Sequence, residues 1–229
     1  MTNKQINPSN NTLHQQPPQP ALVPVIPAAI LERIFADLGE KKWSCCSGLL
    51  PQEFVAALAQ ECQFIFEQGD FKTAGIGPQG QQSLQPQIRN DFIHWLLPSP
   101  ARPVQIDFVK FLEELRQSLN QALFLNLKRV EAHFAQYPPG GAYAKHIDNP
   151  RRQGHRLITF ILYLNPHWEI SHGGELALYN PEDESTVIAK IAPRHGDFVL
   201  FCSDVFPHEV EKSSVLRRSL TGWFRNDAL

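Results

Sequence analysis

The sequence has no long hydrophobic run, no excess of basic residues and few cysteines. No stretch approaches the roughly 18 consecutive apolar residues that a membrane-spanning helix requires, and the first residues lack the apolar segment of a secretory signal. A net charge of -2 and a pI of about 6.5 do not provide the concentrated basic surface that binds phosphate groups. We therefore expect neither a membrane protein nor a nucleic-acid-binding protein.

The four cysteines do not have the spacing of a disulfide framework. Cys45 and Cys46 are adjacent, so their side chains would point to opposite faces of a strand, and the other two are Cys62 and Cys202. Reduced, buried sulfur fits a cytoplasmic protein, which is the location we expect.

Composition along the chain predicts one domain behind a polar tail. Residues 1–26 are rich in Asn, Gln and Pro, so they bury too little apolar surface to offset the entropy of ordering and are expected to be disordered. Residues 27–229 can bury one sizeable core. Within them we expect helical support over 27–125 and a strand-rich core over 126–226, in a protein that acts as a monomer.

The first part of this domain has helical periodicity. Apolar residues recur at helical spacing after Pro27, again between Pro51 and Gly69, and again over 104–123. Residues 74–87 have no periodicity and contain several glycines, which predicts a mobile loop of the kind that often serves as a lid.

Strand patterns dominate after the third helix. Two short strands are also expected earlier, and eight strands separated by Pro/Gly turns follow residue 125: 43–50 and 88–96, then 128–137, 143–149, 156–165, 174–180, 186–191, 197–202, 207–212 and 216–225. This spacing predicts a jelly-roll barrel, and helices that precede the strands fit helices packed outside a sheet. The expected fold class is mainly β with flanking helices.

A candidate metal site combines two histidines and one carboxylate. His146 and Asp148 are two residues apart on an expected strand, so both side chains project from one face, and His208 begins a later strand. Two histidines and a carboxylate form the facial triad of non-haem iron(II) oxygenases, which leaves coordination positions open. Zinc accepts the same ligand types but usually keeps one open position in a catalytic site.

The non-functional alternative is a surface turn at His146 and structural or solvated histidines elsewhere, and no role is assigned to His155, His167, His172 and His195. Arg217 favours the functional interpretation. Strand alternation places Arg217 on one face together with Ser219, Thr221 and Trp223. A guanidinium inside a barrel needs an anionic partner, and a dicarboxylate ligand suits the two-pronged grip of arginine. The neighbouring Arg218 is expected on the surface, paired with an acidic residue.

Four segments together resemble the HIF-type prolyl 4-hydroxylases. They are 137–150 (YPPGGAYAKHIDNP), 156–165 (RLITFILYLN), 173–176 (GGEL) and 207–210 (PHEV), the last followed by Arg217. The similarity runs from about residue 30 to 225. It implies a double-stranded β-helix and an iron(II)- and 2-oxoglutarate-dependent dioxygenase that hydroxylates a prolyl residue at the 4-position and releases succinate and carbon dioxide.

The resemblance also implies roles for single residues. Iron(II) would be held by His146, Asp148 and His208, and dioxygen would be a co-substrate, with ascorbate as an accessory reductant. The distal carboxylate of 2-oxoglutarate would be held by Arg217 and Tyr163, with Thr221 and Trp223 alongside and Tyr137 and Tyr143 near the metal. Collagen-type enzymes have lysine where Arg217 stands, so the similarity is to the HIF-type branch.

The implied partner is a protein substrate with a loop proline. Residues 88–95 resemble the segment after the finger loop of these enzymes, in which the aspartate matched by Asp91 pairs with the arginine matched by Arg156 beside the substrate. Arg89, Asp91, Arg156 and Trp223 are therefore expected to contact or shape the substrate site. Bacterial members suggest elongation factor Tu as the target, and animal members suggest oxygen sensing. The Gln/Pro tail and the different finger loop leave the substrate open.

Two other functions are compatible with the same residues. A related 2-oxoglutarate oxygenase could act on another amino acid or small molecule. A barrel that binds metal without turnover is disfavoured, because a pure binder has no need of open iron positions.

Overall fold

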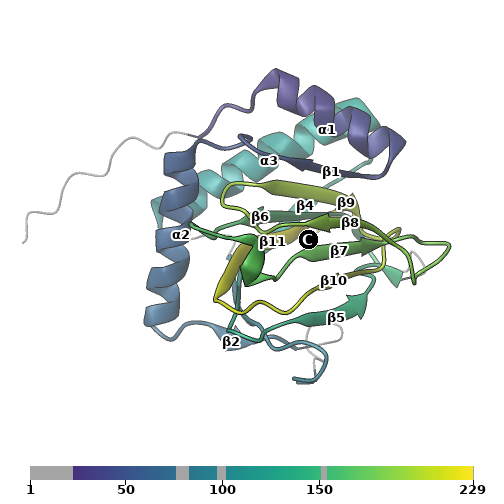
Figure 1. Ribbon diagram of the computed structural model, residues 1–229. Helices are drawn as coiled ribbons and strands as arrows, with labels where there is room; N and C mark the ends of the chain where they lie inside the picture. The colour runs from purple at the N-terminus through teal and green to yellow at the C-terminus, as the bar shows by residue number, and fades with distance from the viewer. Residues whose placement is uncertain (1–22, 76–82, 97–101, 151–153, 229) are drawn as a thin grey trace, which may run out of the picture.

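Two antiparallel sheets form the centre of the protein in a computed structural model that describes residues 23–75, 83–96, 102–150 and 154–228 (Figure 1). The major sheet has the strand order β1-β9-β6-β11-β4-β3-β2, and the minor sheet has the order β5-β10-β7-β8. The strands are β1 (Trp43–Cys46), β2 (Lys72–Thr73), β3 (Phe92–Trp95), β4 (Arg129–Tyr137), β5 (Tyr143–His146), β6 (Arg156–Tyr163), β7 (Leu176–Tyr179), β8 (Val187–Ile191), β9 (Phe198–Cys202), β10 (His208–Val210) and β11 (Arg217–Arg225).

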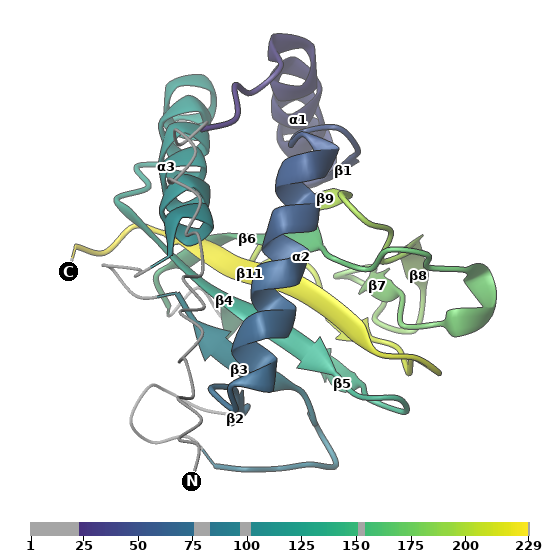
Figure 2. The same cartoon turned by 90° about the vertical axis from the view of Figure 1, so that its left-hand side faces the viewer.

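Helices cover one side of the major sheet, as Figure 2 shows. They are α1 (Ala28–Glu40), α2 (Gln52–Glu67) and α3 (Pro103–Leu123), and a short 3-10 turn, η2 (Ile170–His172), lies among the strands. A proline stands before or at the first turn of each α-helix, where its fixed φ and missing N–H do no harm. α3 ends at Leu123, and the capping residue Phe124 adopts the left-handed conformation with φ 53°.

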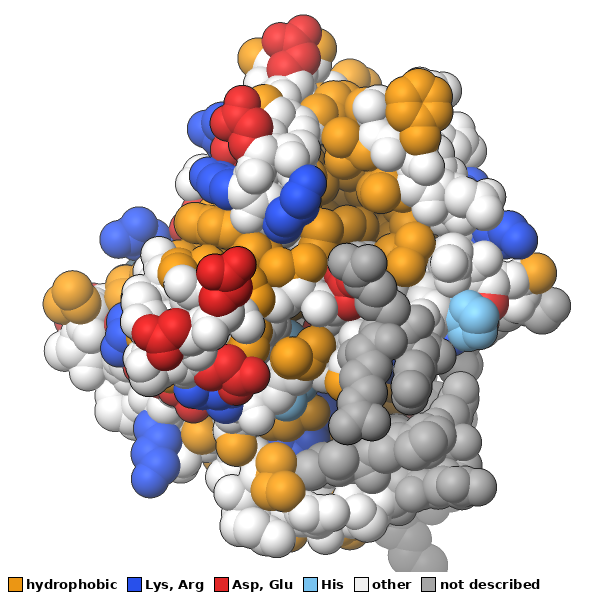
Figure 3. All heavy atoms as spheres, turned by 90° about the vertical axis from the view of Figure 1, so that its right-hand side faces the viewer, with side chains coloured by type: hydrophobic (Ala, Val, Ile, Leu, Met, Phe, Trp, Pro, Cys, Tyr) orange, Lys and Arg blue, Asp and Glu red, His pale blue; other side chains and the backbone are white. Residues whose placement is uncertain are grey.

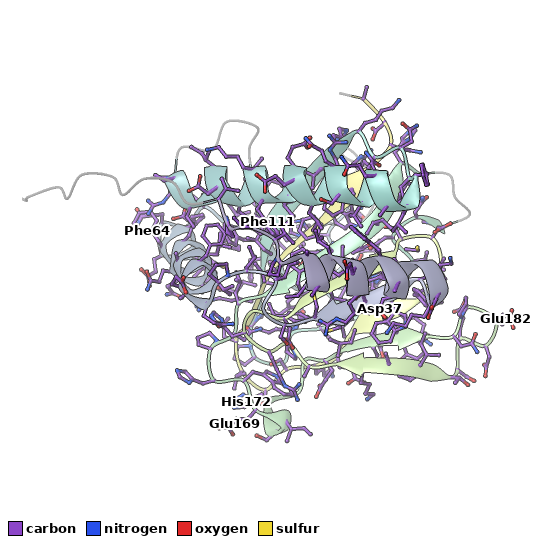
Figure 4. All side chains as sticks on the ribbon, turned by 90° about the horizontal axis from the view of Figure 1, so that it is seen from above. Asp37, Phe64, Phe111, Glu169, His172 and Glu182 are labelled. Atoms are coloured by element: carbon purple, nitrogen blue, oxygen red, sulfur yellow. The ribbon has the colours of Figure 1, made fainter. Side chains whose placement is uncertain are left out.

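The two faces of the major sheet have different tasks. Phe134, Phe160 and Leu220 are fully buried on the outer face and pack with residues of all three helices in the main hydrophobic core. Figure 4 shows Phe111 on the side of α3 that is turned toward α1 and α2. The inner face alternates with the outer one along each strand and faces the minor sheet, so it carries the residues predicted to form the site.

Most of the predicted elements are confirmed. The eight strands after residue 125 are present with ends shifted by a few residues, the expected strand 43–50 stops at Cys46, and β2 was missed because two residues carry no periodicity. Residues 1–22 of the predicted tail and residues 76–82 of the predicted lid lie outside the described residues.

Apolar side chains also reach the surface beside the helices. Figure 3 shows them gathered in the upper part of one face, where partly buried hydrophobic residues border the main core. Among the described residues, no helix combines the length and apolar character needed to cross a membrane.

Gly222, in the middle of β11, lies at a position with no room for a side chain. A Cβ at this position would overlap the backbone carbonyl of Glu131 and lie 2.6 Å from Cζ of Phe160. A backbone oxygen in a central strand pair cannot move aside, so Gly222→Ala should destabilise the fold by about 3 kcal/mol and lower the unfolding midpoint by roughly 10 °C.

The matched control for this prediction is Gly39→Ala in α1. An added Cβ at Gly39 would have no neighbour within 4 Å. Because alanine favours a helix more than glycine, this variant should be neutral or more stable by up to about 1 kcal/mol. Thermal denaturation of both variants checks the pair, and equal midpoints would contradict the packing argument.

Candidate active site

The two histidines of the predicted triad meet across a strand pair of the minor sheet. His146 ends β5 and His208 begins β10, and the antiparallel register places the two residues directly opposite each other, with ring centroids 4.3 Å apart. The Nδ1 atom of His146 lies 2.9 Å from the carbonyl oxygen of Ala144, and that of His208 lies 3.0 Å from the carbonyl oxygen of Phe206. A carbonyl only accepts, so each Nδ1 is the donor and each Nε2 keeps its lone pair for a metal.

Asp148 completes the group from the turn after β5. Its Oδ1 lies 3.5 Å from Nε2 of His146 and its Oδ2 lies 3.7 Å from Nε2 of His208. The ligand atoms of the three residues all lie within 4.8 Å of one another. Two groups of the major sheet bind the same oxygen, since the Thr159 hydroxyl and the Trp223 indole N–H donate to Oδ2 over 2.7 and 2.9 Å.

The charge states of these groups suit a divalent cation. Burial alone would raise the pKa of the Asp148 carboxyl, but the neighbouring His208 and His146 and the hydrogen bond from Trp223 lower that pKa well below its usual range. Burial, reinforced by His146, lowers the pKa of His208 to about 4 against the opposite effect of Asp148. At neutral pH the site therefore offers a carboxylate and a neutral imidazole without releasing protons.

Such a donor set fits iron(II). Two imidazoles and one carboxylate on one side of an ion leave further positions for other ligands, as in the non-haem iron oxygenases. The residues present are thus chemically suited to the metal that the sequence predicts.

Arg217 lies buried at the start of β11, and not all of its nitrogen atoms are hydrogen-bonded within the described residues. Its Nε donates to the carbonyl oxygen of Gly174 over 2.8 Å, and its guanidinium carbon is 5.1 Å from the ring centres of both Tyr137 and Tyr163. Within the described residues, its Nη2 and the Tyr163 hydroxyl have no hydrogen-bond partner although both atoms are buried. Gly174 has φ +80°, and a Cβ there would press on Ser213 and on Cδ of Arg217, so this close approach requires glycine.

Unpaired buried donors indicate a missing anionic partner. A buried cation without a counter-ion is costly, and a carboxylate could accept from Arg217 and Tyr163 together. Burial raises the pKa of Tyr163 above its usual range even though Arg217 acts to lower it, so the phenol stays protonated and can donate. Arg217 and Tyr163 together are therefore suited to bind one carboxylate of a 2-oxoglutarate molecule.

The remaining predicted site residues surround these two groups. Tyr143 stacks on His146 with ring centroids 3.7 Å apart, and Tyr137 is buried beside Arg217. Thr221 is half-buried on the inner face of β11, with its hydroxyl 3.1 Å from that of Ser219. The structure therefore brings all six predicted co-substrate residues to the space between the sheets.

One predicted contact is wrong. Asp91 is fully buried and does not pair with Arg156, because it receives two hydrogen bonds from Arg89, at 2.8 and 2.6 Å. Arg156 instead donates to Glu131 over 2.8 Å and lies over the ring of Trp223 at 3.5 Å. Arg89 is two residues from Asp91 and reaches it first, while the carboxylate that Arg156 reaches is that of Glu131 on β4, across the intervening strand β11.

The expected surface pairing of Arg218 with an acidic residue is also wrong, since Arg218 donates to Gln136 and Gln63. Three residues at the site were not predicted from the sequence: Thr159, which donates to Asp148, and His133 and Trp95, whose rings contact Trp223. Strand alternation was the available signal, because His133 shares a face with Tyr137, and Thr159 shares one with Tyr163.

Comparison with known proteins agrees with this geometry. A family model described as the 2OG-Fe(II) oxygenase superfamily matches residues 132–225. A hypoxia-inducible factor prolyl hydroxylase of Caenorhabditis elegans is 31% identical over 205 residues, which are 85% of this chain but 28% of that protein. The chain thus spans less than a third of the length of this relative.

Two solved structures have the same fold over most of their length. A Trichoplax adhaerens prolyl hydroxylase in complex with a hypoxia-inducible factor peptide fragment is 26% identical, with 86% of this chain and 90% of that one covered and a TM-score of 0.77. A Pseudomonas putida prolyl-4-hydroxylase is 36% identical, with 86% of this chain and 99% of that one covered and a TM-score of 0.77. Both of these structures are of prolyl hydroxylases, and the chain belongs with them to the 2OG-Fe(II) oxygenase superfamily.

Proposed function

We propose that the protein is an iron(II)- and 2-oxoglutarate-dependent dioxygenase that hydroxylates a prolyl residue, at the 4-position, in a protein substrate. The balanced reaction inserts one oxygen atom of dioxygen into a C–H bond, while 2-oxoglutarate takes the other and becomes succinate and carbon dioxide. The observation that carries the proposal is the pair of unpartnered buried donors, Arg217 and Tyr163, in the same inter-sheet space as the triad.

Each group has a separate task in this reaction. His146, Asp148 and His208 would hold the iron, which when bound supplies the activation of dioxygen. Arg217 and Tyr163 would bind the distal carboxylate of 2-oxoglutarate and fix its orientation, which is catalysis by positioning. The tyrosines and the apolar residues between the sheets keep bulk water away from the reacting atoms.

The substrate would approach along the wall formed by Trp223 and Arg156. Arg156 is 31% exposed at its side chain and lies flat on the indole, so the pair offers an apolar ring and a cation at the same place. The known relatives that carry the name prolyl hydroxylase, including one crystallised with a peptide, support a protein substrate. Elongation factor Tu is the first target to test, with the enzyme acting as a monomer in the reducing cytoplasm.

The test is an incubation of the purified protein with iron(II), 2-oxoglutarate, ascorbate and a candidate protein under air. Succinate should form in equal amount to a +16 Da product, and amino-acid analysis should identify 4-hydroxyproline. Succinate without any modified proline would support the alternative of another amino-acid or small-molecule substrate. No succinate with any candidate, from protein that binds metal and 2-oxoglutarate, would contradict the proposal.

A further inference from the structure

Three aromatic side chains and one guanidinium form a continuous cluster on the inner face of the major sheet, beside the metal ligands. Trp95 of β3, His133 of β4 and Trp223 of β11 are neighbours, with centroid distances of 4.7 Å from Trp95 to His133 and 5.6 Å from His133 to Trp223. The two indoles lie 6.4 Å apart, and Arg156 of β6 lies 3.5 Å over the ring of Trp223. The cluster extends from Trp95, which is 36% exposed, to Trp223, whose indole N–H donates to Asp148.

The indole of Trp223 is held from two directions. The imidazole of His133 lies at an angle of 31° to it, and Arg156 is anchored by its own hydrogen bond to Glu131. An indole held in this way cannot rotate freely, so its N–H stays aimed at Oδ2 of Asp148. Because Thr159 donates to the same oxygen, the carboxylate is fixed in its plane, with Oδ1 on the side of His146.

Apart from these ring contacts, no function is evident for His133. It is 4% exposed, and its Nδ1 is buried without a hydrogen-bond partner among the described residues. Burial, together with Arg89 and Arg156, lowers the pKa of His133 to about 3, so the ring is neutral. A neutral flat ring can pack against both indoles near two guanidinium groups without electrostatic repulsion.

We infer that His133 and Trp95 are positioning residues that act through Trp223 to orient the Asp148 carboxylate for metal binding. The inference rests on the proposed function, because it assumes that Asp148 is a metal ligand. It assigns a role in the metal site to two side chains that do not touch the metal ligands themselves. Partners of this kind typically change metal affinity by about 10- to 100-fold.

Metal binding without turnover provides the first test. Mn²⁺ titration of the full chain, followed by electron paramagnetic resonance, should show about tenfold weaker binding for His133→Leu than for the parent. His133→Phe keeps a flat ring beside both indoles and should retain most of the parent's Mn²⁺ affinity. Leucine and phenylalanine both remove the unpartnered Nδ1, so a loss of Mn²⁺ affinity that occurs only in His133→Leu is due to the missing aromatic ring. Equal Mn²⁺ affinity in all three proteins would overturn the inference.

A double-mutant cycle separates positioning from general packing. Trp223→Phe keeps a ring but removes the N–H donor to Asp148, and it should weaken Mn²⁺ binding by about tenfold. If His133 acts through that N–H, the double variant His133→Leu/Trp223→Phe should bind Mn²⁺ about as well as Trp223→Phe alone. Losses that multiply in the double variant would overturn the inference.

If His133→Leu does not fold, Trp95→Leu tests the same inference. It should also weaken Mn²⁺ binding, whereas the control Phe66→Leu should not. Phe66, on α2, is 38% exposed, much as Trp95 is, and its ring contacts are Phe71 and Phe92, neither of which is a metal ligand. Equal affinities for Trp95→Leu and the parent would contradict the role of Trp95. A parent protein that does not bind Mn²⁺ would contradict the proposed function, so the two failures are distinguishable.

Discussion

Asp148→Asn is expected to remove turnover and to weaken Mn²⁺ binding by about 100-fold or more, because it replaces the anionic ligand by a neutral amide of the same shape. The asparagine carbonyl can still accept from Thr159 and Trp223, so the hydrogen bonds around the side chain are largely kept. What is lost is the negative charge that faces His146 and His208 and that a divalent cation requires. The effect should therefore appear in metal binding before it appears in folding.

The measurement compares thermal unfolding with and without Mn²⁺. The parent should be stabilised by saturating metal, since a ligand that binds the folded state raises its stability, and Asp148→Asn should lose this increase. The control is Asp37→Asn on α1, whose carboxylate accepts from Ser44 outside the inter-sheet space. Figure 4 labels Asp37 on this helix. An equal metal-induced shift in Asp148→Asn and the parent would exclude Asp148 as a ligand.

The fold could be predicted from sequence largely because the strands alternate. Period-two patterns bounded by Pro and Gly turns identified the eight strands of the second half, and they placed Arg217 on an inward face, whereas Tyr163 was indicated by the family resemblance. Their ends were less accurate, and β2, which has two residues, had no pattern to find.

The convergence of the triad could not be derived from spacing alone. His146 and Asp148 are neighbours in sequence, but His208 meets them only because β10 pairs with β5 in a register that sets His208 opposite His146. A sequence gives each strand and not its partner, so this step depended on resemblance to a known family. The structure then supplied the register.

Which side chains pair with each other was the feature least predictable from the sequence. Arg156 was expected to pair with Asp91, but Arg89 occupies that carboxylate with two hydrogen bonds and Arg156 turns to Glu131. Several arginines and carboxylates lie within reach of one another at this end of the sheet, and which pairs form depends on distances of a few ångströms that no sequence pattern encodes. Strand alternation could have placed His133 on the inner face, but its contact with Trp223 depends on such distances and was not predicted.

Arg217→Ala should weaken 2-oxoglutarate binding by about 100-fold or more, because removal of one partner from a buried ion pair leaves the other charge without compensation. Tyr163→Phe removes one neutral donor to the same carboxylate and should have a smaller effect, about tenfold. Binding of 2-oxoglutarate to the Mn²⁺-loaded protein, measured by calorimetry, gives these affinities without turnover. Mn²⁺ affinity in the absence of 2-oxoglutarate should be unchanged, since Arg217 contacts Gly174 and the tyrosines and not the triad.

Two further variants decide whether the effect belongs to the guanidinium. Arg218→Ala removes the next arginine on β11, which faces Gln136 and Gln63 on the other side of the sheet, and it should leave 2-oxoglutarate affinity unchanged. Arg217→Lys keeps the charge but loses the two-pronged grip, so its affinity should lie between those of the parent and Arg217→Ala. The apoprotein of Arg217→Ala should remain folded, because the variant removes a buried cation with an unpartnered nitrogen. A folded Arg217→Ala protein that binds 2-oxoglutarate as tightly as the parent would show that the carboxylate is held elsewhere, and the reason for a buried arginine at this position would have to be sought in the packing of the two tyrosines.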